Sequence, residues 1–113
     1  MADDAEPQVP EGAAIFPLIP AELGIHPLLL VVLHAVVFLD GSEDDVVDAD
    51  AASETLEYVA TYLQRLTGSE RARVREDMEC LAAYGRAQQW SKQQIRFLKE
   101  FLSIYGVADE GAA

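Results

Sequence analysis

Four aspartates within one short segment are the residues of this chain whose types and spacing best fit a metal site. The segment DGSEDDVVDAD, residues 40–50, carries six carboxylates among its eleven residues. Calcium and magnesium bind oxygen ligands, and calcium takes about six to eight of them. The sequence therefore predicts an irregular Ca²⁺ or Mg²⁺ site built from four side chains: Asp40, Asp44, Asp48 and Asp50.

The spacing of this segment does not follow the EF-hand pattern. Counted from Asp40, the sixth position is Asp45 where an EF-hand has glycine, and the twelfth is Ala51 where it has glutamate. The alternative to a metal site is a solvated loop in which Asp50 caps the helix that follows it. Glu54 would then lie in the first turn of that helix, where its charge is favourable to the helix dipole.

The rest of the sequence contains no catalytic motif. It has no glycine-rich phosphate loop, no CxxC or HExxH pair and no nucleophile elbow. His26 and His34 would stand about 12 Å apart on one helix, too far to share a metal ion. Core packing is the simplest role for His34 and for Cys80, the only cysteine. We therefore expect a protein that is not an enzyme and has no cofactor besides the candidate divalent ion.

The charge of the chain is strongly negative and unevenly distributed. A net charge of −12 disfavours nucleic acid and anionic membranes as partners. Residues 1–64 hold thirteen acidic and no basic residues, whereas residues 65–113 hold eight basic and seven acidic ones, a mixed-charge solvated surface. Such halves can pair with each other, with a second copy or with a basic partner. The alternative is that the surplus carboxylates only confer solubility.

The elements that position these residues are organised around PLLLVVLHAVVFL, residues 27–39, the most apolar run of the chain. Thirteen residues are too few to cross a bilayer as a helix, which takes about 20. A buried helix fits best, with Pro27 in its first turn and a left-handed Gly41 at its end. A buried strand is the alternative, but no second strand-like run could pair with it. A helix apolar on every face is surrounded by other helices or shared with a partner.

An acidic tail and an apolar arm precede this run. Residues 1–14 are mostly Asp, Glu, Ala, Pro and Gly, and we expect them to be disordered. Residues 15–27, IFPLIPAELGIHP, are held extended by their prolines, with one helical turn at Ala21–Leu23. The large apolar side chains of this arm need a surface to cover, either the core of the same chain or a groove on a partner.

Two amphipathic helices follow the acidic loop. The first runs from about Ala51 to Leu66, and its apolar residues recur at spacings of four and three. The second runs from about Glu70, with Ser69 as its cap, to Tyr84, where Gly85 stops it. Its apolar face is narrow and consists of four residues: Val74, Met78, Leu81 and Ala82.

The last helix has the clearest start signal in the chain. We expect it to run from Lys92 to about Tyr105, with Gly106 at its end. A capping box and a hydrophobic staple open it, formed by the pairs Ser91 with Gln94 and Trp90 with Ile95. Its wide apolar stripe indicates contact with two neighbours or an exposed binding strip, and includes Phe97, Phe101 and Ile104.

Two segments together resemble the two halves of the TerB-like helical domains of tellurite-resistance proteins. The first is HAVVFLDG with the acidic residues after it, and the second is AAYGRAQQWSKQQIRFLKEFLSIYGV; together they span about residues 28–107. The resemblance implies that acidic residues after Asp40-Gly41 bind a divalent metal. The loop to Glu54 is longer than the family's usual spacing, so the register of the acidic ligands departs from the family pattern. In the second half, Tyr84-Gly85 replaces Asp-Gly and Arg86 follows it, so the resemblance implies that this half of a metal site is lost.

These patterns together predict an all-α fold. We expect a four-helix compact domain at residues 15–107 that includes an extended proline-rich N-terminal arm, and a frayed tail at residues 108–113. The lone cysteine and the lack of a signal-peptide pattern favour the cytoplasm. Six apolar side chains are the candidates for contact with a protein partner: Ile15, Phe16, Leu18, Ile19, Phe97 and Phe101.

The function predicted from the sequence is that of a non-enzymatic helical protein-interaction module. It would self-associate as a homo-oligomer or serve as a small subunit of a larger assembly. The alternative is a divalent-metal-binding stress-response domain of the TerB-like type. A nucleic-acid mimic is a third option, because a strongly acidic half can imitate phosphate, but carboxylates clustered in a loop support it poorly.

Overall fold

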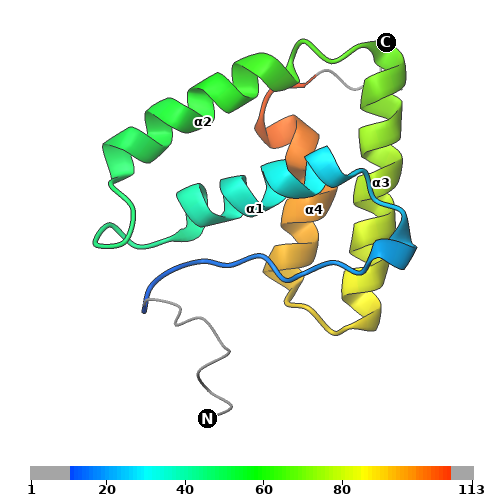
Figure 1. Ribbon diagram of the computed structural model, residues 1–113, viewed down its shortest axis with the longest axis horizontal. Helices are drawn as coiled ribbons and strands as arrows, with labels where there is room; N and C mark the ends of the chain where they lie inside the picture. Colours follow the sequence, from blue (N-terminus) through cyan, green and yellow to red (C-terminus); the bar gives the residue numbers. More distant parts are fainter. Residues whose placement is uncertain (1–10, 108–113) are drawn as a thin grey trace.

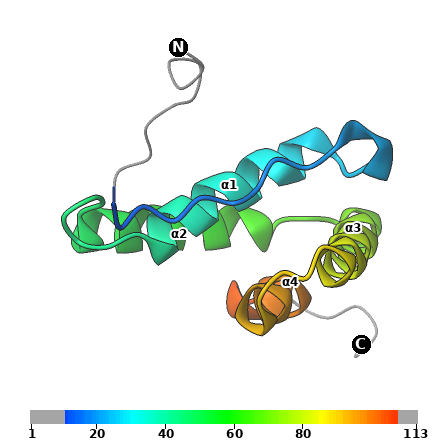
Figure 2. The same ribbon diagram turned by 90° about the horizontal axis from the view of Figure 1, so that it is seen from below.

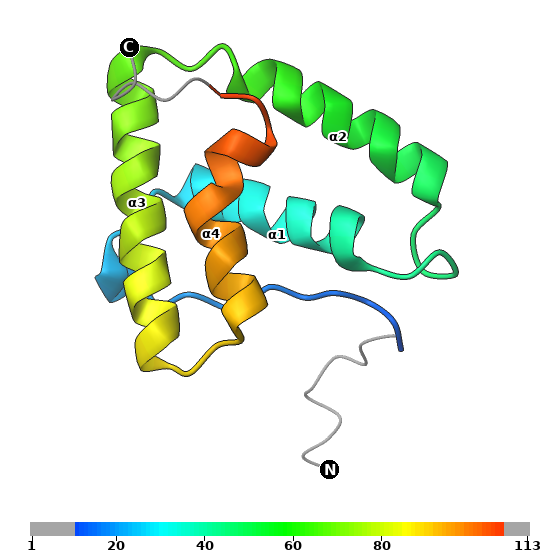
Figure 3. The ribbon, with the colours of Figure 1, turned by 180° about the vertical axis from the view of Figure 1, so that it is seen from behind.

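Four α-helices in two crossed pairs make up most of residues 11–107, the part of the chain that the computed structural model describes. The helices are α1 (Pro27–Gly41), α2 (Ala49–Leu63), α3 (Gly68–Ala87) and α4 (Lys92–Ile104), preceded by one 3-10 turn, η2 (Ala21–Leu23). Helices α1 and α2 lie side by side, and α3 and α4 form a second pair that runs crosswise to the first (Figure 1; Figure 3). The predicted all-α fold is confirmed. Residues 1–10 and 108–113 lie outside the described residues, whereas residues 11–14, which the sequence assigned to the disordered N-terminal tail, are described and make hydrogen bonds to Glu43 and Ser42.

Helix α1 is the predicted apolar helix, and it packs one face on the α3–α4 pair. Three of its residues at spacings of four and three are buried there: Leu29, Leu33 and Val36. Pro27 is its first residue, and the Leu28 N–H donates to Nδ1 of His26, which caps the helix. Gly41 is not left-handed as predicted but is the last helical residue. It is glycine because a Cβ there would lie 2.9 Å from the Cβ of Ala14.

The N-terminal arm runs antiparallel along α1, as Figure 2 shows. The Glu43 N–H donates to the Gly12 carbonyl at 2.9 Å, and the Ala14 N–H donates to the Ser42 hydroxyl at 2.8 Å. Phe16 is 1% exposed, so the arm covers the core of its own chain. Its ring meets His34 edge-to-face at 5.2 Å between centroids, which gives His34 an aromatic partner within the fold.

The α3–α4 pair is closed by a turn that differs from the predicted one. Gly85 does not stop α3, which continues to Ala87. Gln88 is the C-cap, Gln89 after it is left-handed with a φ of 63°, and the Trp90 N–H donates back to the Gly85 carbonyl at 2.9 Å. Gly85 is required for a different reason, because a Cβ there would clash with the Trp90 ring and lie 2.8 Å from Ile95.

Helices α2 and α3 each start two residues earlier than predicted, because a different side chain caps each of them. Asp48 rather than Asp50 caps α2, and its Oδ2 accepts from the Ala51 N–H at 2.8 Å. Thr67 rather than Ser69 caps α3, in a full capping box with Glu70. Four other predicted features are confirmed: the η2 turn, Pro27 as the first residue of α1, the Ser91 cap and the start of α4 at Lys92.

The core lies where α1, the arm and the α3–α4 pair meet. Its largest fully buried side chains are Phe16, Phe101, Leu33, Leu81, Leu98 and Val36. Helix α2 lies at the edge of this core: Ala52 is its one fully buried residue, and its apolar stripe is half-buried. No helix among residues 11–107 is long and apolar enough to cross a membrane.

The arm provides a matched pair of substitutions that tests whether Phe16 anchors it. Phe16→Ala should lower the free energy of unfolding by about 3–5 kcal/mol, because it leaves a cavity among buried side chains. Leu18→Ala, two residues away on an exposed side chain, should change it by less than about 0.5 kcal/mol. Both values come from chemical denaturation followed by circular dichroism. Similar losses in the two variants would contradict docking of the arm on its own core.

Candidate interaction surfaces

In the described part of the chain, the carboxylates of the acidic loop are not gathered around one point that could hold a metal ion. All four predicted ligands are exposed: Asp40, Asp44, Asp48 and Asp50. Among residues 11–107, no group of three or more His, Cys, Asp or Glu side chains is arranged to hold a metal ion. Asp48 uses a carboxylate oxygen to cap α2. The loop therefore caps a helix, as the alternative to a metal site predicted, although Asp50 was the residue expected to do so. The described geometry therefore gives the loop a structural role at the start of α2.

The six predicted partner-binding side chains divide between the core and the surface. Phe16, Ile19 and Phe101 are buried in the core of the same chain. Phe97 is half-buried and packs edge-to-face on Phe101, with 5.7 Å between ring centroids. Ile15 and Leu18 are exposed, at 57% and 90%. Along the arm, Phe16 and Ile19 therefore point into the domain, and Ile15 and Leu18 point toward solvent.

The arm and α1 together expose four large apolar side chains, with exposed fractions of 57%, 90%, 69% and 64%: Ile15, Leu18, Leu28 and Val31. We call this set the apolar face. No charged residue occurs between Pro27 and Leu39, so α1 carries no charge before Asp40. Contiguous exposed apolar patches are typical of sites of protein contact. Individually, Leu28 and Val31 were not predicted, although the all-round apolar run was the signal for them.

A buried carboxylate fixes this face to the α3–α4 pair. Asp77 on α3 is buried, and its Oδ2 accepts from the His26 N–H at 3.1 Å, just before α1 begins. Its Oδ1 accepts from Arg73 Nε at 3.0 Å. Arg73 in turn donates to the Gly24 carbonyl at 3.1 Å. The start of α1 is therefore tied to α3 by hydrogen bonds as well as by apolar packing.

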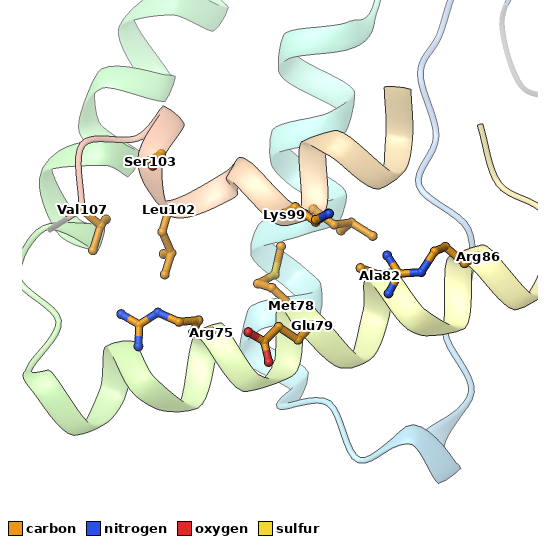
Figure 4. A pocket seen from close by; sticks show the side chains of 10 residues that line it. Arg75, Met78, Glu79, Ala82, Arg86, Lys99, Leu102, Ser103 and Val107 are labelled. Carbon is orange, nitrogen blue, oxygen red and sulfur yellow. The ribbon is translucent and has the colours of Figure 1, made fainter. Parts of the chain in front are cut away.

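A groove between α3 and α4 forms a second surface, which differs from the apolar face in carrying basic side chains. Its volume is about 320 Å³, and α1 lies behind it in Figure 4. We call it the basic groove; its apolar lining is Met78, Ala82, Leu98, Leu102 and Val107, and its polar lining is Arg75, Glu79, Arg86, Lys99 and Ser103. The sequence placed these basic residues on a mixed-charge solvated face. It did not reveal that they flank a hollow with an apolar floor.

The two surfaces lie on parts of the molecule with opposite charge. Residues 11–64, which include the arm, α1 and α2, carry ten acidic and no basic side chains. Every lysine and arginine of the chain lies at or after Arg65. The acidic part also acts on Tyr105 at the end of α4: burial raises the pKa of its hydroxyl above 10, and the charge of Asp40 raises that pKa further.

Comparison with models of protein families, with curated proteins and with solved structures finds no match to this chain. The resemblance to TerB-like domains therefore stays a prediction.

The acidic loop supplies a test of a capping role against a ligand role. Asp48→Ala should lower the free energy of unfolding by about 1 kcal/mol, because the Ala51 N–H loses its acceptor. Asp44→Ala removes an equally exposed carboxylate that caps nothing, and should leave stability unchanged within about 0.5 kcal/mol. Thermal unfolding with Ca²⁺, Mg²⁺ or a matched ionic strength of NaCl measures both effects. A stabilisation specific to one divalent ion that both variants abolish would instead establish the predicted metal site.

Proposed function

We propose that this chain is a non-enzymatic helical interaction module that self-associates through its apolar face. The observation that carries the proposal is the exposure of Leu18, Leu28 and Val31, three large apolar side chains of the arm and of α1. Burial of a large apolar side chain contributes about 1.5–3 kcal/mol. Association costs about 4–15 kcal/mol in lost freedom. Four such side chains from each of two copies can exceed that cost when most of them become buried together.

The order of residues on α1 fits an antiparallel pair of copies related by a two-fold axis. Leu28, Val31 and Ala35 are exposed at helical spacings of three and four. If the axis passes between Val31 and Val32, Leu28 of one copy faces Ala35 of the other, and Val31 faces Val32. A large side chain opposite a small one lets two helices interdigitate. A two-fold interface of this kind uses the same patch on both copies, as most homodimers do.

Electrostatics gives this dimer a characteristic response to salt. Each copy brings the acidic part of the chain, residues 11–64, to the same side of the molecule. Like charges repel through solvent, and the screening length is about 10 Å at 0.1 M salt. Added salt should therefore strengthen an association that is driven by apolar burial and opposed by charge.

The proposed setting is a reducing compartment such as the cytoplasm. Cys80 is a free, half-buried thiol, and its Sγ lies 3.9 Å from the Leu23 carbonyl beneath the η2 turn. A packed thiol of this kind acts as a small apolar side chain. It supports a structural role for Cys80 and adds nothing to a catalytic one.

A charge placed on the apolar face tests the proposal. Val31→Glu should abolish self-association, because dimerisation would bury an unpaired carboxylate. Thr61→Glu adds the same charge at an exposed position of α2 and should leave association intact. Sedimentation equilibrium over a wide range of concentration, at low and high NaCl, measures both variants and the parent chain. A parent chain that stays monomeric in every condition would overturn the proposal, and so would equal association of Val31→Glu.

A further inference from the structure

We propose that the basic groove between α3 and α4 binds an acidic amphipathic helix of a partner protein. This site is separate from the apolar face and goes beyond self-association. The groove combines the two features that such a ligand needs, an apolar floor and basic side chains beside it. Helix-in-groove binding of this type places the apolar stripe of the ligand on the floor and its charges along the edges.

The shape of the groove follows from the α3–α4 pair. Helices α3 and α4 pack side by side, and the groove follows both for several turns, from Arg75 to Arg86 on α3 (Figure 4). Met78 and Leu102 point into the space between the helices, and Lys99 lies over it from the α4 side (Figure 4). An elongated hollow between two helices fits an elongated ligand with one apolar stripe.

The charge of the groove selects an anionic ligand. A second hollow of about 650 Å³ adjoins it and shares Arg86 and Lys99 with it. The two hollows together are lined by five basic and two acidic side chains: Arg75, Arg86, Lys92, Arg96, Lys99, Glu79 and Glu100. Arg86, Lys92, Arg96 and Lys99 are all exposed and reach solvent. Carboxylates on a ligand would meet complementary charge along its whole length.

The remaining features favour a protein helix over a nucleic acid. A phosphate backbone gains nothing from a floor of Met78, Leu98 and Leu102, whereas an apolar stripe becomes buried on it. Glu79 and Glu100 would repel closely spaced phosphates. A chain with a net charge of −12 also repels a polyanion at long range. A short acidic helix can orient its carboxylates away from the two glutamates.

The experiment uses the full chain and a fluorescent synthetic peptide as the probe. The peptide has leucine at positions one, four, eight and eleven and glutamate or alanine elsewhere, so that a helix presents one apolar stripe with acidic edges. We expect binding, measured by fluorescence anisotropy, that weakens as NaCl is raised. Lys99→Glu should weaken it by about tenfold or more, because one rim charge is reversed. Arg65→Glu makes the same change of charge outside the groove and should have less than a twofold effect.

Three further results would overturn the proposal. The first is equal binding of a control peptide whose leucines are replaced by glutamine, or of single-stranded oligonucleotide, since either would reveal only a general anion surface. The second is the absence of binding to the parent chain at low salt. The third is self-association at low salt that Lys99→Glu abolishes, which would identify a second copy as the occupant. This last result differs from dimerisation through the apolar face, which Val31→Glu disrupts and salt strengthens.

Discussion

The constraint on which the rest of the structure depends is the burial of α1, a helix with no charged side chain from Pro27 to Leu39. The α3–α4 pair takes its inner face, the arm takes a second side through Phe16, and α2 packs beside it. The fold is therefore arranged around one helix that could not be stable alone in water. Both ends of α1 in turn hold the elements that cover it. Ser42 at the end of α1 accepts a hydrogen bond from the arm, and the His26 N–H just before α1 donates to Asp77 on α3. One outer strip remains uncovered.

Apolar runs, helical spacings, prolines and capping residues were enough to predict all four helices, the η2 turn and the order of the elements. They did not predict how α1 and α3 end, because side chains in neighbouring elements decide those points. Gly85 was interpreted as a helix stop, yet its role is to let Trp90 and Ile95 approach α3. Gly41 was expected to be left-handed, yet it makes room for Ala14 on the arm. In both cases the glycine is explained by a contact across the fold, which a local pattern does not contain.

The candidate surfaces were harder to predict than the fold for the same physical reason. The sequence identified six apolar side chains that need to be covered, but not which of them the domain itself covers. Phe16 and Ile19 turn inward, whereas Ile15 and Leu18 turn outward, and only docking of the arm on α1 decides between them. The basic groove was less visible still. It exists because two stripes from separate helices, around Met78 and Leu98, meet beneath flanking arginine and lysine side chains.

Charge separates the two surfaces in a way that bears on how they can be used together. The apolar face belongs to a part of the chain with ten acidic and no basic side chains, so the proposed self-association would strengthen when salt screens the repulsion between copies. The proposed binding of an acidic helix in the basic groove would strengthen at low salt, where the attraction between opposite charges is screened less. The elements that carry the two surfaces share one core, and α1 lies behind the groove in Figure 4. A ligand in the groove therefore need not displace a second copy from α1, and ionic strength can shift the balance between the two contacts.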